Sequence, residues 1–462
     1  MEWKLEHGSR AALLGNRSLF RAVRRPERKD EKMVIRLIRS HLILACCGIL
    51  GAVVVVTMVG NSVRTVAAAP AGQSSLSASA LSSSAGTAAQ MLPSSSQGTA
   101  AGNEMRAVWV PYLSLTMTGE NDRSEQAFRQ KFSAVVQTAK SCKMNTVIVQ
   151  VRPFGDALYS SSYFPWSHLL SGTQGKNPGY DPLKDMVEIS HSAGLKIQAW
   201  VNPLRIKTSG TPQNLSTNNP YYKFHNDTGK SDYVAEFNGG IYYNPAYADV
   251  RALVADGVGE IVKNYSVDGI QFDDYFYPTK DAAFDQRAYQ NYCDSAQKSG
   301  TPLPLDEWRR ANISEMVAQV YRAVKAAKKN VPFGIAPQGN VNNDMEMGAD
   351  VYAWCSTRGY IDYICPQLYY NFQNPTLPFD RAADTWCDLV KNRDIKLYFG
   401  LAAYKAASNA DSGTWKDSSA ILAAEVQYGR TRKCDGFMFY SCDYLTGDQT
   451  KREIQNVIKL LN

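Results

Sequence analysis

The chain has 462 residues and is 44% hydrophobic, so it is long enough for one large globular domain or two ordinary ones. Its 50 Lys and Arg against 43 Asp and Glu give a formal charge of +7, and the first 40 residues, with eleven basic and five acidic side chains, carry +6 of it. The rest is close to neutral, which excludes a strong attraction to phosphate backbones, and we expect no nucleic-acid partner.

The first segments of the chain predict export. Residues 42–60 form an uncharged, mostly apolar run that is long enough to cross a bilayer as a helix. The basic residues precede it, which predicts a cytoplasmic tail at residues 1–41 and places the remainder outside the cytoplasm. A signal that starts at Met33 and is cleaved near Ala67-Ala68-Ala69 is the alternative, giving a secreted protein. We favour the uncleaved single-pass anchor, which makes the cytoplasmic membrane a partner.

A low-complexity stretch follows at residues 61–103. It is dominated by Ser, Ala, Gly and Thr, and from residue 65 onward it holds no charge. Such a composition cannot bury an apolar core, so it predicts a flexible tether. The folded domain is therefore expected at residues 104–462.

Strand and helix patterns alternate through this domain. Strands are predicted at residues 106–111, 145–152, 195–202, 267–274, 332–338, 361–369, 396–402 and 435–441, and helices at residues 125–140, 183–193, 247–264, 313–329, 350–356, 380–391, 418–430 and 451–461. Eight strand–helix units are typical of the α/β class and of a (β/α)₈ TIM barrel. A doubly wound sheet is the alternative, but the first strand is not followed by a Gly-rich phosphate loop.

Several motifs are absent. The sequence has no H-x-H, H-E-x-x-H, G-x-S-x-G or P-loop pattern, so we expect no metal, no other cofactor and no esterase chemistry. Nine cysteines are scattered without a disulfide-scaffold spacing. In an exported domain Cys434 and Cys442 could form a pair.

The fourth predicted strand ends in two adjacent acids, Asp273 and Asp274, among aromatic residues. Adjacent carboxylates repel each other, which raises the pKa of one of them. A proton donor beside a charged partner is the equipment of glycoside hydrolysis. The non-functional alternative for an Asp-Asp pair alone is a strand that ends in a solvent-exposed turn.

Other polar and aromatic residues follow the predicted strands. In a barrel these ends meet at one rim, where amides and Arg can bind sugar hydroxyls and flat rings can stack on sugars. The substrate-binding candidates are Arg152, Asp156, Trp200, Asn202, Gln271, Tyr275, Gln338, Gln367, Tyr369 and Tyr440, with Arg205 just beyond the third strand. Core filling is the alternative for Trp200, Tyr369 and Tyr440. An ion pair with Asp156 is the alternative for Arg152.

Five segments resemble the bacterial glycosyl-hydrolase-like 10 family, and the resemblance runs over roughly residues 104–462. They are residues 104–109, Gln150-Val-Arg-Pro-Phe-Gly-Asp-Ala-Leu-Tyr159, Gln198-Ala-Trp-Val-Asn-Pro-Leu-Arg205, residues 268–278 and Pro366-Gln-Leu-Tyr-Tyr370. The resemblance implies a barrel glycosidase outside the cytoplasmic membrane. It also implies a link to peptidoglycan glycan strands, including strands stripped of their peptides, with substrates that vary among relatives.

Two further resemblances bear on mechanism. The segment around Asp273 is similar to the fourth-strand motif of family 18 chitinases, but Tyr275 stands where those enzymes place an acidic Glu. Phe272-Asp273-Asp274 looks more like the paired aspartates of family 84 N-acetylglucosaminidases. That likeness implies that Asp273 polarises the 2-acetamido group of the substrate and that Asp274 is the general acid. Neighbouring strand residues face opposite ways, so both acids reach one sugar only if the strand ends or bulges there.

We therefore expect an extracytoplasmic glycoside hydrolase that acts on an amino-sugar polysaccharide, most readily cell-wall glycan. One alternative is a hydrolase of an exopolysaccharide or α-glucan with an Asp nucleophile and a loop acid. Another is a non-catalytic barrel that binds the cell wall.

Overall fold

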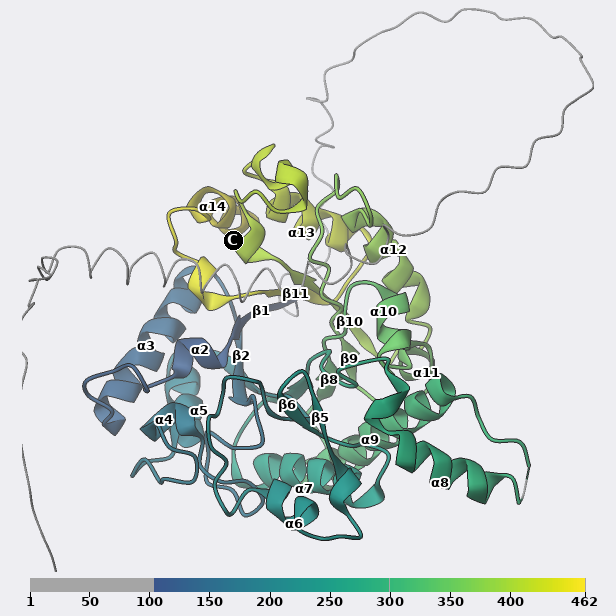
Figure 1. Cartoon of the computed structure of the whole chain (residues 1–462). Coiled ribbons are helices and arrows are strands. Elements are labelled where there is room, and N and C mark those ends of the chain that lie inside the picture. The colour runs from purple at the N-terminus through teal and green to yellow at the C-terminus, as the bar shows by residue number, and fades with distance from the viewer. Residues whose placement is uncertain (1–103, 299, 462) are drawn as a thin grey trace, which may run out of the picture. The chain divides into compact units, whose positions relative to one another are not determined.

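The computed structural model describes residues 104–298 and 300–461, in which eight parallel strands close into a barrel (Figure 1). Around the barrel the order is β1-β11-β10-β9-β8-β7-β3-β2. The strands are β1 (Met105–Val110), β2 (Thr146–Arg152), β3 (Lys196–Val201), β7 (Gly269–Phe272), β8 (Phe333–Ile335), β9 (Tyr363–Ile364), β10 (Lys396–Leu401) and β11 (Gly436–Phe439). The predicted (β/α)₈ architecture is confirmed.

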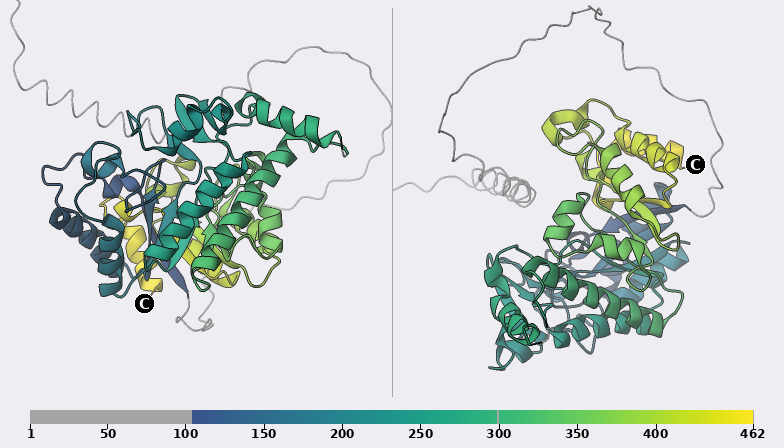
Figure 2. Two further views of the ribbon diagram at one scale, coloured as in Figure 1. Left: turned by 90° about the horizontal axis from the view of Figure 1, so that it is seen from below. Right: turned by 90° about the vertical axis from the view of Figure 1, so that its right-hand side faces the viewer.

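Helices surround the barrel (Figure 2). The longer ones are α3 (Glu125–Ser141), α5 (Pro182–Ser192), α7 (Ala248–Asn264), α8 (Gln286–Ala296), α9 (Leu305–Ala327), α12 (Phe379–Leu389), α13 (Ile421–Thr431) and α14 (Lys451–Leu460). The short ones are α2 (Tyr112–Leu115), α4 (His168–Ser171), α6 (Pro220–His225), α10 (Val341–Glu346) and α11 (Val351–Ser356). Their apolar stripes face the strands: α3, for example, begins after the capping side chain of Ser124 and buries Phe128, Phe132 and Val136.

Two apolar layers result. The larger lies between the strands and the helices, and the smaller fills the barrel with Ala107, Trp109, Ile148, Trp200, Ala336, Tyr363, Cys365 and Met438. The interior is tightly packed, because a Cβ on Gly334 would lie 2.3 Å from the ring of Tyr363. The barrel is therefore a filled core whose reactive groups must lie at its rim.

Some predicted boundaries are wrong. The strands predicted at residues 332–338 and 361–369 reduce to the short β8 and β9. Pro337 and Pro366 interrupt them because proline has no N–H for the ladder, which resumes as isolated bridges between Gln338 and Gln367 and between Gln367 and Gly400. The helix predicted at residues 313–329 begins eight residues earlier, at Leu305, directly after Pro304.

The long loops after β3 and β7 contain structure that the sequence did not predict. After β3, the strands β4 (Arg205–Lys207), β6 (Gly240–Tyr243) and β5 (Val234–Phe237) form a small antiparallel sheet in the order β4-β6-β5. After β7, α8 extends away from the barrel at the lower right of Figure 1. A buried ion pair between Arg309 of α9 and Asp285 fixes the start of this helix.

Two further expectations concern export. The apolar run at residues 42–60 lies outside the described residues. Within residues 104–298 and 300–461, no helix has the length and apolar character needed to span a membrane. The suggested Cys434–Cys442 pair is wrong: both thiols are free, since they lie at opposite ends of β11, too far apart for a disulfide.

Candidate active site

The acid pair lies where β7 ends. The strand stops at Phe272, so Asp273 and Asp274 belong to the following turn rather than to the alternating strand. Asp273 is only 4% exposed, whereas Asp274 is half-buried and Tyr275 is 41% exposed. Both acids can reach one sugar only if the strand ends there, and it does. Asp273 is the deeper of the two, and Asp274 lies nearer the solvent.

Three donors hold the carboxylate of Asp273. Its Oδ2 accepts hydrogen bonds from Asn202 Nδ2 at 2.5 Å and from Trp200 Nε1 at 3.1 Å. Its Oδ1 accepts from the backbone N–H of Tyr275 at 3.3 Å. Donors on both oxygens leave this side chain a single orientation and favour its ionised form.

A buried relay fixes the amide of Asn202. Gln150 Nε2 donates to Asn202 Oδ1 at 2.6 Å, so the amide nitrogen of Asn202 is left to face Asp273. The Oε1 of Gln150 in turn accepts the backbone N–H of Tyr112 at 3.0 Å. The position of Asp273 thus depends on β2 and β3 and on the first residue of α2.

Asp274 has fewer partners. Its Oδ1 accepts from Gln367 Nε2 at 3.3 Å, and Gln367 also donates to the carbonyl of Ala336 at 2.9 Å. Gln338 lies beside this bond, and its backbone N–H donates to buried Asp344. The side chain of Gln367 therefore contacts the acid pair directly. The side-chain Oε1 of Gln338 instead accepts a hydrogen bond from Asn343 Nδ2.

Burial is the main cause of the raised pKa values in the pair. It raises the pKa of Asp273 to about 7, with the neighbouring charge of Asp274 as the second cause, and the pKa of Asp274 to about 6. The hydrogen bonds and the positive charge of Arg205 act in the opposite direction and are outweighed. Because the two groups interact, these values belong to the pair, which holds one proton near neutral pH.

One wall of the site is made by Arg205 at the start of β4. Its Nε donates to the carbonyl of Pro153 at 2.9 Å. Its guanidinium carbon lies 5.0 Å from the ring centre of Phe154 and 4.9 Å from that of Tyr275. This contact places a cation beside the residue that follows the two acids.

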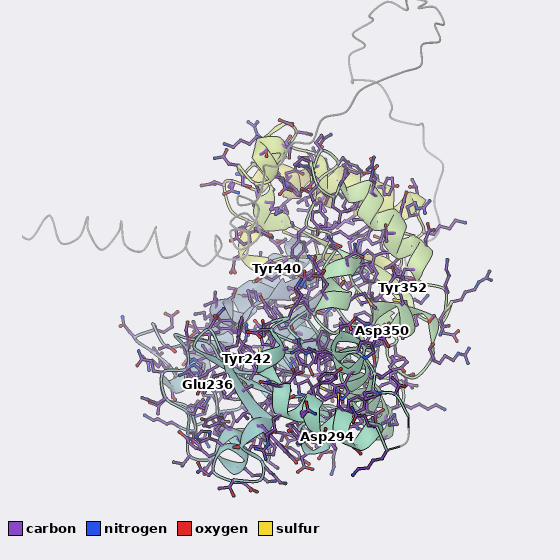
Figure 3. All side chains as sticks on the ribbon, turned by 45° about the vertical axis from the view of Figure 1, so that its right-hand side comes forward. Glu236, Tyr242, Asp294, Asp350, Tyr352 and Tyr440 are labelled. Atoms are coloured by element: carbon purple, nitrogen blue, oxygen red, sulfur yellow. The ribbon has the colours of Figure 1, made fainter. Side chains whose placement is uncertain are left out.

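Aromatic residues gather at another part of the rim. Tyr440, which follows β11, has its ring centre 6.0 Å from those of Tyr369 and Tyr404 and 6.1 Å from that of Trp109. Figure 3 shows Tyr440 and Tyr242 of β6 in the central part of the molecule. The structure therefore brings Tyr369 and Tyr440 together on the rim, as the predicted strand ends required.

Three predicted binding residues lie away from this opening. Gln271 is fully buried, and its amide contacts Trp109 Nε1 at 2.6 Å and Met438 Sδ at 3.6 Å, so it supports Trp109 from below. Arg152 is buried against the ring of Phe164 at 4.2 Å. Asp156 is also buried and accepts from His168 and Gln174.

The displacement of Arg152 has a local cause. The pairing of β2 with β3 shifts between Gln150 and Arg152, which breaks the alternation that would have put both side chains on one face. The alternative of an ion pair between Arg152 and Asp156 is wrong, because the described residues show none between them and the carboxylate of Asp156 instead contacts His168 Nδ1 at 2.9 Å. We therefore place both residues outside the acid-pair site.

Gln150, Trp109 and the pairing role of Gln367 with Asp274 were not singled out from the sequence. Gln150 carried a usable signal, since it is an amide in the middle of an otherwise apolar strand and such a group needs a buried partner. Trp109 carried none, because a tryptophan in a strand is typical of a core. Among residues 104–298 and 300–461, no group of three or more His, Cys, Asp or Glu could hold a metal ion.

Comparisons with known proteins identify relatives of this chain. The sequence profile of the family described as glycosyl hydrolase-like 10 matches residues 104–417. Glycosyl hydrolase YngK of Bacillus subtilis (strain 168) is 37% identical over 335 residues, or 68% of this chain and 63% of the relative. Glycosyl hydrolase DigH of Escherichia coli (strain K12) is 30% identical over 376 residues, or 76% of this chain and 83% of the relative.

A structural comparison adds only the fold. The catalytic domain of a β-amylase from Paenibacillus polymyxa superposes with a TM-score of 0.53 at 10% identity, covering 78% of this chain and 99% of that domain. At that identity the likeness shows a shared barrel and nothing about substrate. The family match covers seven of the eight barrel strands, the acid pair and Arg205, so this chain belongs to the glycosyl hydrolase-like 10 family.

Proposed function

We propose that this glycoside hydrolase cleaves an amino-sugar polysaccharide, most readily the glycan of the bacterial cell wall, with the 2-acetamido group of the substrate as nucleophile. The observation that carries the proposal is the unequal holding of two adjacent acids. Asp273 is buried and fixed by three donors, whereas Asp274 is half-buried with one side-chain donor. One acid is thus suited to orient a group and the other to exchange a proton.

The reaction follows from those positions. Asp273, as a carboxylate, accepts the acetamide N–H, and the acetamide carbonyl oxygen attacks the anomeric carbon. The bond to the leaving oxygen breaks as Asp274 gives that oxygen its proton. In the second step the Asp274 carboxylate takes a proton from a water molecule as that water attacks the anomeric carbon of the cyclic oxazolinium. The ring opens, the sugar is released, and Asp274 is protonated again.

The two pKa values alone would place the shared proton on Asp273, whose pKa is the higher, whereas the proposed roles need it on Asp274. The higher value on Asp273 arises partly from the charge of Asp274, and that repulsion disappears once Asp274 carries the shared proton. The donors from Asn202 and Trp200 then favour the ionised form of Asp273, against the burial that raises its pKa. Adjacent aspartates are also poorly placed as a separated acid and nucleophile, whose carboxyls lie about 5–5.5 Å apart across the bond in retaining enzymes.

Two rival functions remain distinct in chemistry. A hydrolase of an exopolysaccharide or α-glucan would use one Asp as nucleophile and would not need an acetamide. A non-catalytic cell-wall-binding barrel would bind glycan without turnover.

We also propose that the domain works outside the cytoplasm, held by residues 42–60 or released after their cleavage, since the basic residues precede that run.

Substitution of the acids tests the mechanism. We expect Asp273→Asn and Asp274→Asn each to lower turnover of N-acetylated glycan by about 10²–10⁴-fold. An aryl glycoside, whose leaving group needs little protonation, should partly restore Asp274→Asn but not Asp273→Asn. Asp268→Asn, at the opposite end of β7, is the matched control and should keep its turnover.

An inhibitor separates the rivals. A thiazoline that mimics the cyclic intermediate should bind far more tightly than the parent sugar. Equal turnover of 2-hydroxy and 2-acetamido substrates, together with a trapped glycosyl-aspartate, would replace the proposal by the Asp-nucleophile mechanism.

A further inference from the structure

Charge is distributed unevenly over the two ends of the barrel. Residues 104–462 contain as many Lys and Arg as Asp and Glu, so the domain is neutral as a whole. The loops of the carboxyl-terminal rim are acidic: residues 336–350 hold three acids and residues 440–450 hold two, and neither loop has a Lys or Arg. The compensating cations must therefore lie elsewhere, and many of them lie at the amino-terminal end, where each helix leads into the next strand.

Seven cations at the amino-terminal end are exposed and have no ionic partner among the residues that the structure describes. They are Lys143, Lys196, Lys263, Lys329, Lys391, Arg393 and Lys433, here called the basic face. The acids at this end are instead occupied by other cations, in the pairs Asp362–Lys325, Asp394–Arg358, Asp435–Lys396 and Glu104–Arg430. The basic face therefore presents an uncompensated positive charge to its surroundings.

The layout of the basic face indicates what kind of partner it fits. Its members come from six different helix-to-strand junctions, so they are spread around the barrel axis. An extended anionic surface can contact many of them at once, whereas a small ligand can contact only a few. The chain also enters the domain at this end, because β1 begins at Met105 and Glu104 bonds Arg430. The preceding sequence, which includes the apolar run at residues 42–60, is thus joined to the domain beside the basic face.

We propose that the basic face docks on the anionic headgroups of a lipid membrane and turns the rim with Asp273 and Asp274 away from it. The choice of a membrane rests on the proposed location of the domain, whereas the basic face does not. Each Lys or Arg close to an anionic membrane strengthens binding by roughly fivefold. The acidic loops of the rim are repelled by the same surface, so charge sets the orientation of the domain as well as its attachment.

Hydrogen exchange measured by mass spectrometry tests this docking on the full chain. The chain is reconstituted with vesicles of phosphatidylcholine alone or of a three-to-one mixture of phosphatidylcholine and phosphatidylglycerol. We expect the backbone amides of residues 325–332, 389–396 and 430–435 to exchange about tenfold more slowly on the anionic vesicles at low salt. High salt should remove this protection because it screens the attraction. Residues 440–450, at the opposite rim, should exchange equally on both kinds of vesicle.

Substitutions assign the protection to the basic face. One triple variant reverses three of its members: Lys196→Glu, Lys329→Glu and Lys391→Glu. It should lose the protection, since removing three such contacts weakens binding by roughly a hundredfold. The matched control has the same net charge and reverses three exposed lysines that lie elsewhere: Lys176→Glu, Lys223→Glu and Lys416→Glu. It should keep the protection. The first variant should also cleave a soluble glycan fragment at an unchanged rate, so a failure of the proposed reaction is distinguishable from a failure of this inference.

Three results would overturn the inference. One is equal exchange at the basic face on neutral and anionic vesicles. Another is an equal loss of protection in both triple variants, which would reduce the attraction to the net charge of the protein. The third is protection by a soluble polyanion such as polyglutamate without any protection by vesicles, which would assign the basic face to an acidic polymer.

Discussion

Replacing Asn202 by Ala removes the shortest hydrogen bond that the acid pair receives. The bond from Asn202 Nδ2 to Asp273 is 2.5 Å long and lies in a fully buried environment. The substitution also leaves Gln150 Nε2 without its acceptor, so no other amide is positioned to take over. The variant therefore tests whether Asp273 works as a carboxylate.

The expected size follows from that bond. A hydrogen bond to a charged group contributes about 1.5–3 kcal/mol. Because one pKa unit corresponds to about 1.4 kcal/mol, its loss should raise the pKa of Asp273 by about one to two units. Asp273, whose pKa burial already raises to about 7, would then be largely protonated at neutral pH. We expect turnover at pH 7 to fall by about tenfold to a hundredfold.

The pH dependence of kcat/KM is the measurement. The unsubstituted enzyme should give a bell-shaped profile with its maximum near pH 6–7, because activity requires one proton on the pair. In Asn202→Ala the acidic limb should move to higher pH and the basic limb should stay. Asn371→Ala is the control, since this amide is equally buried near a strand end but bonds Thr414 and not an acid. An unmoved acidic limb, or equal losses in both variants, would refute the role assigned to Asp273.

Two further predictions concern stability and domain limits. Glu425 on α13 is buried, and neither of its carboxylate oxygens has a hydrogen-bond partner in the described residues. Burial raises the pKa of this carboxyl well above its ordinary range. Its contribution to stability is therefore complete below the pKa that it has in the unfolded chain, and it is lost as pH rises. Urea unfolding should show stability falling from pH 5 to pH 9 by up to about 1.4 kcal/mol per unit, a slope that Glu425→Gln flattens and exposed Glu236→Gln leaves unchanged. A chain that begins at Asn103 should fold and keep its turnover, because the barrel begins at Met105; insolubility of that chain beside a sound one from Val63 would show the predicted boundary to be wrong.

The periodic parts of the sequence predicted the barrel correctly. Apolar strands and amphipathic helices alternate with few interruptions, and each helix packs on the strands beside it, so local pattern and tertiary contact agree. The position of the acid pair directly after an apolar strand was also predicted from sequence, and the structure places both acids in the turn after β7, while their catalytic role stays a prediction. Asn202, Gln367 and Tyr275 followed from the same reasoning.

The remaining site depended on contacts between segments distant in sequence. Arg152 was misplaced because a register shift in β2 is not visible in a single strand. The β4-β6-β5 sheet, whose strands have only three or four residues each, offered too short an alternation to detect. The confinement of Arg205 depends on Phe154 and Tyr275, which come from two other loops, and no local pattern encodes that meeting.

The same residue types serve opposite purposes at the two ends of the barrel. At the amino-terminal ends, Asp268, Asp362 and Asp435 each precede a strand and accept the backbone N–H of a neighbouring strand, at 2.8 Å from Ile197, 2.7 Å from Phe333 and 3.0 Å from Leu397. Asp362 and Asp435 also lie beside Lys325 and Lys396, so their charges are compensated within the protein, and Asp268 bonds the ring of His191 at 2.8 Å.

At the carboxyl-terminal end of β7, by contrast, Asp273 and Asp274 are adjacent, and the described residues provide no ion pair for either. Hydrogen-bond donors and a nearby arginine moderate the cost of burial without removing it, so a proton stays on the pair near neutral pH. An acid that closes a barrel needs a fixed charge, whereas an acid that cleaves a glycosidic bond needs a proton it can give away. What distinguishes Asp274 from Asp362 and Asp435 is therefore its surroundings, which provide it with no ion pair in the described residues, and this difference supports the proposal that the rim of the barrel is the reactive end.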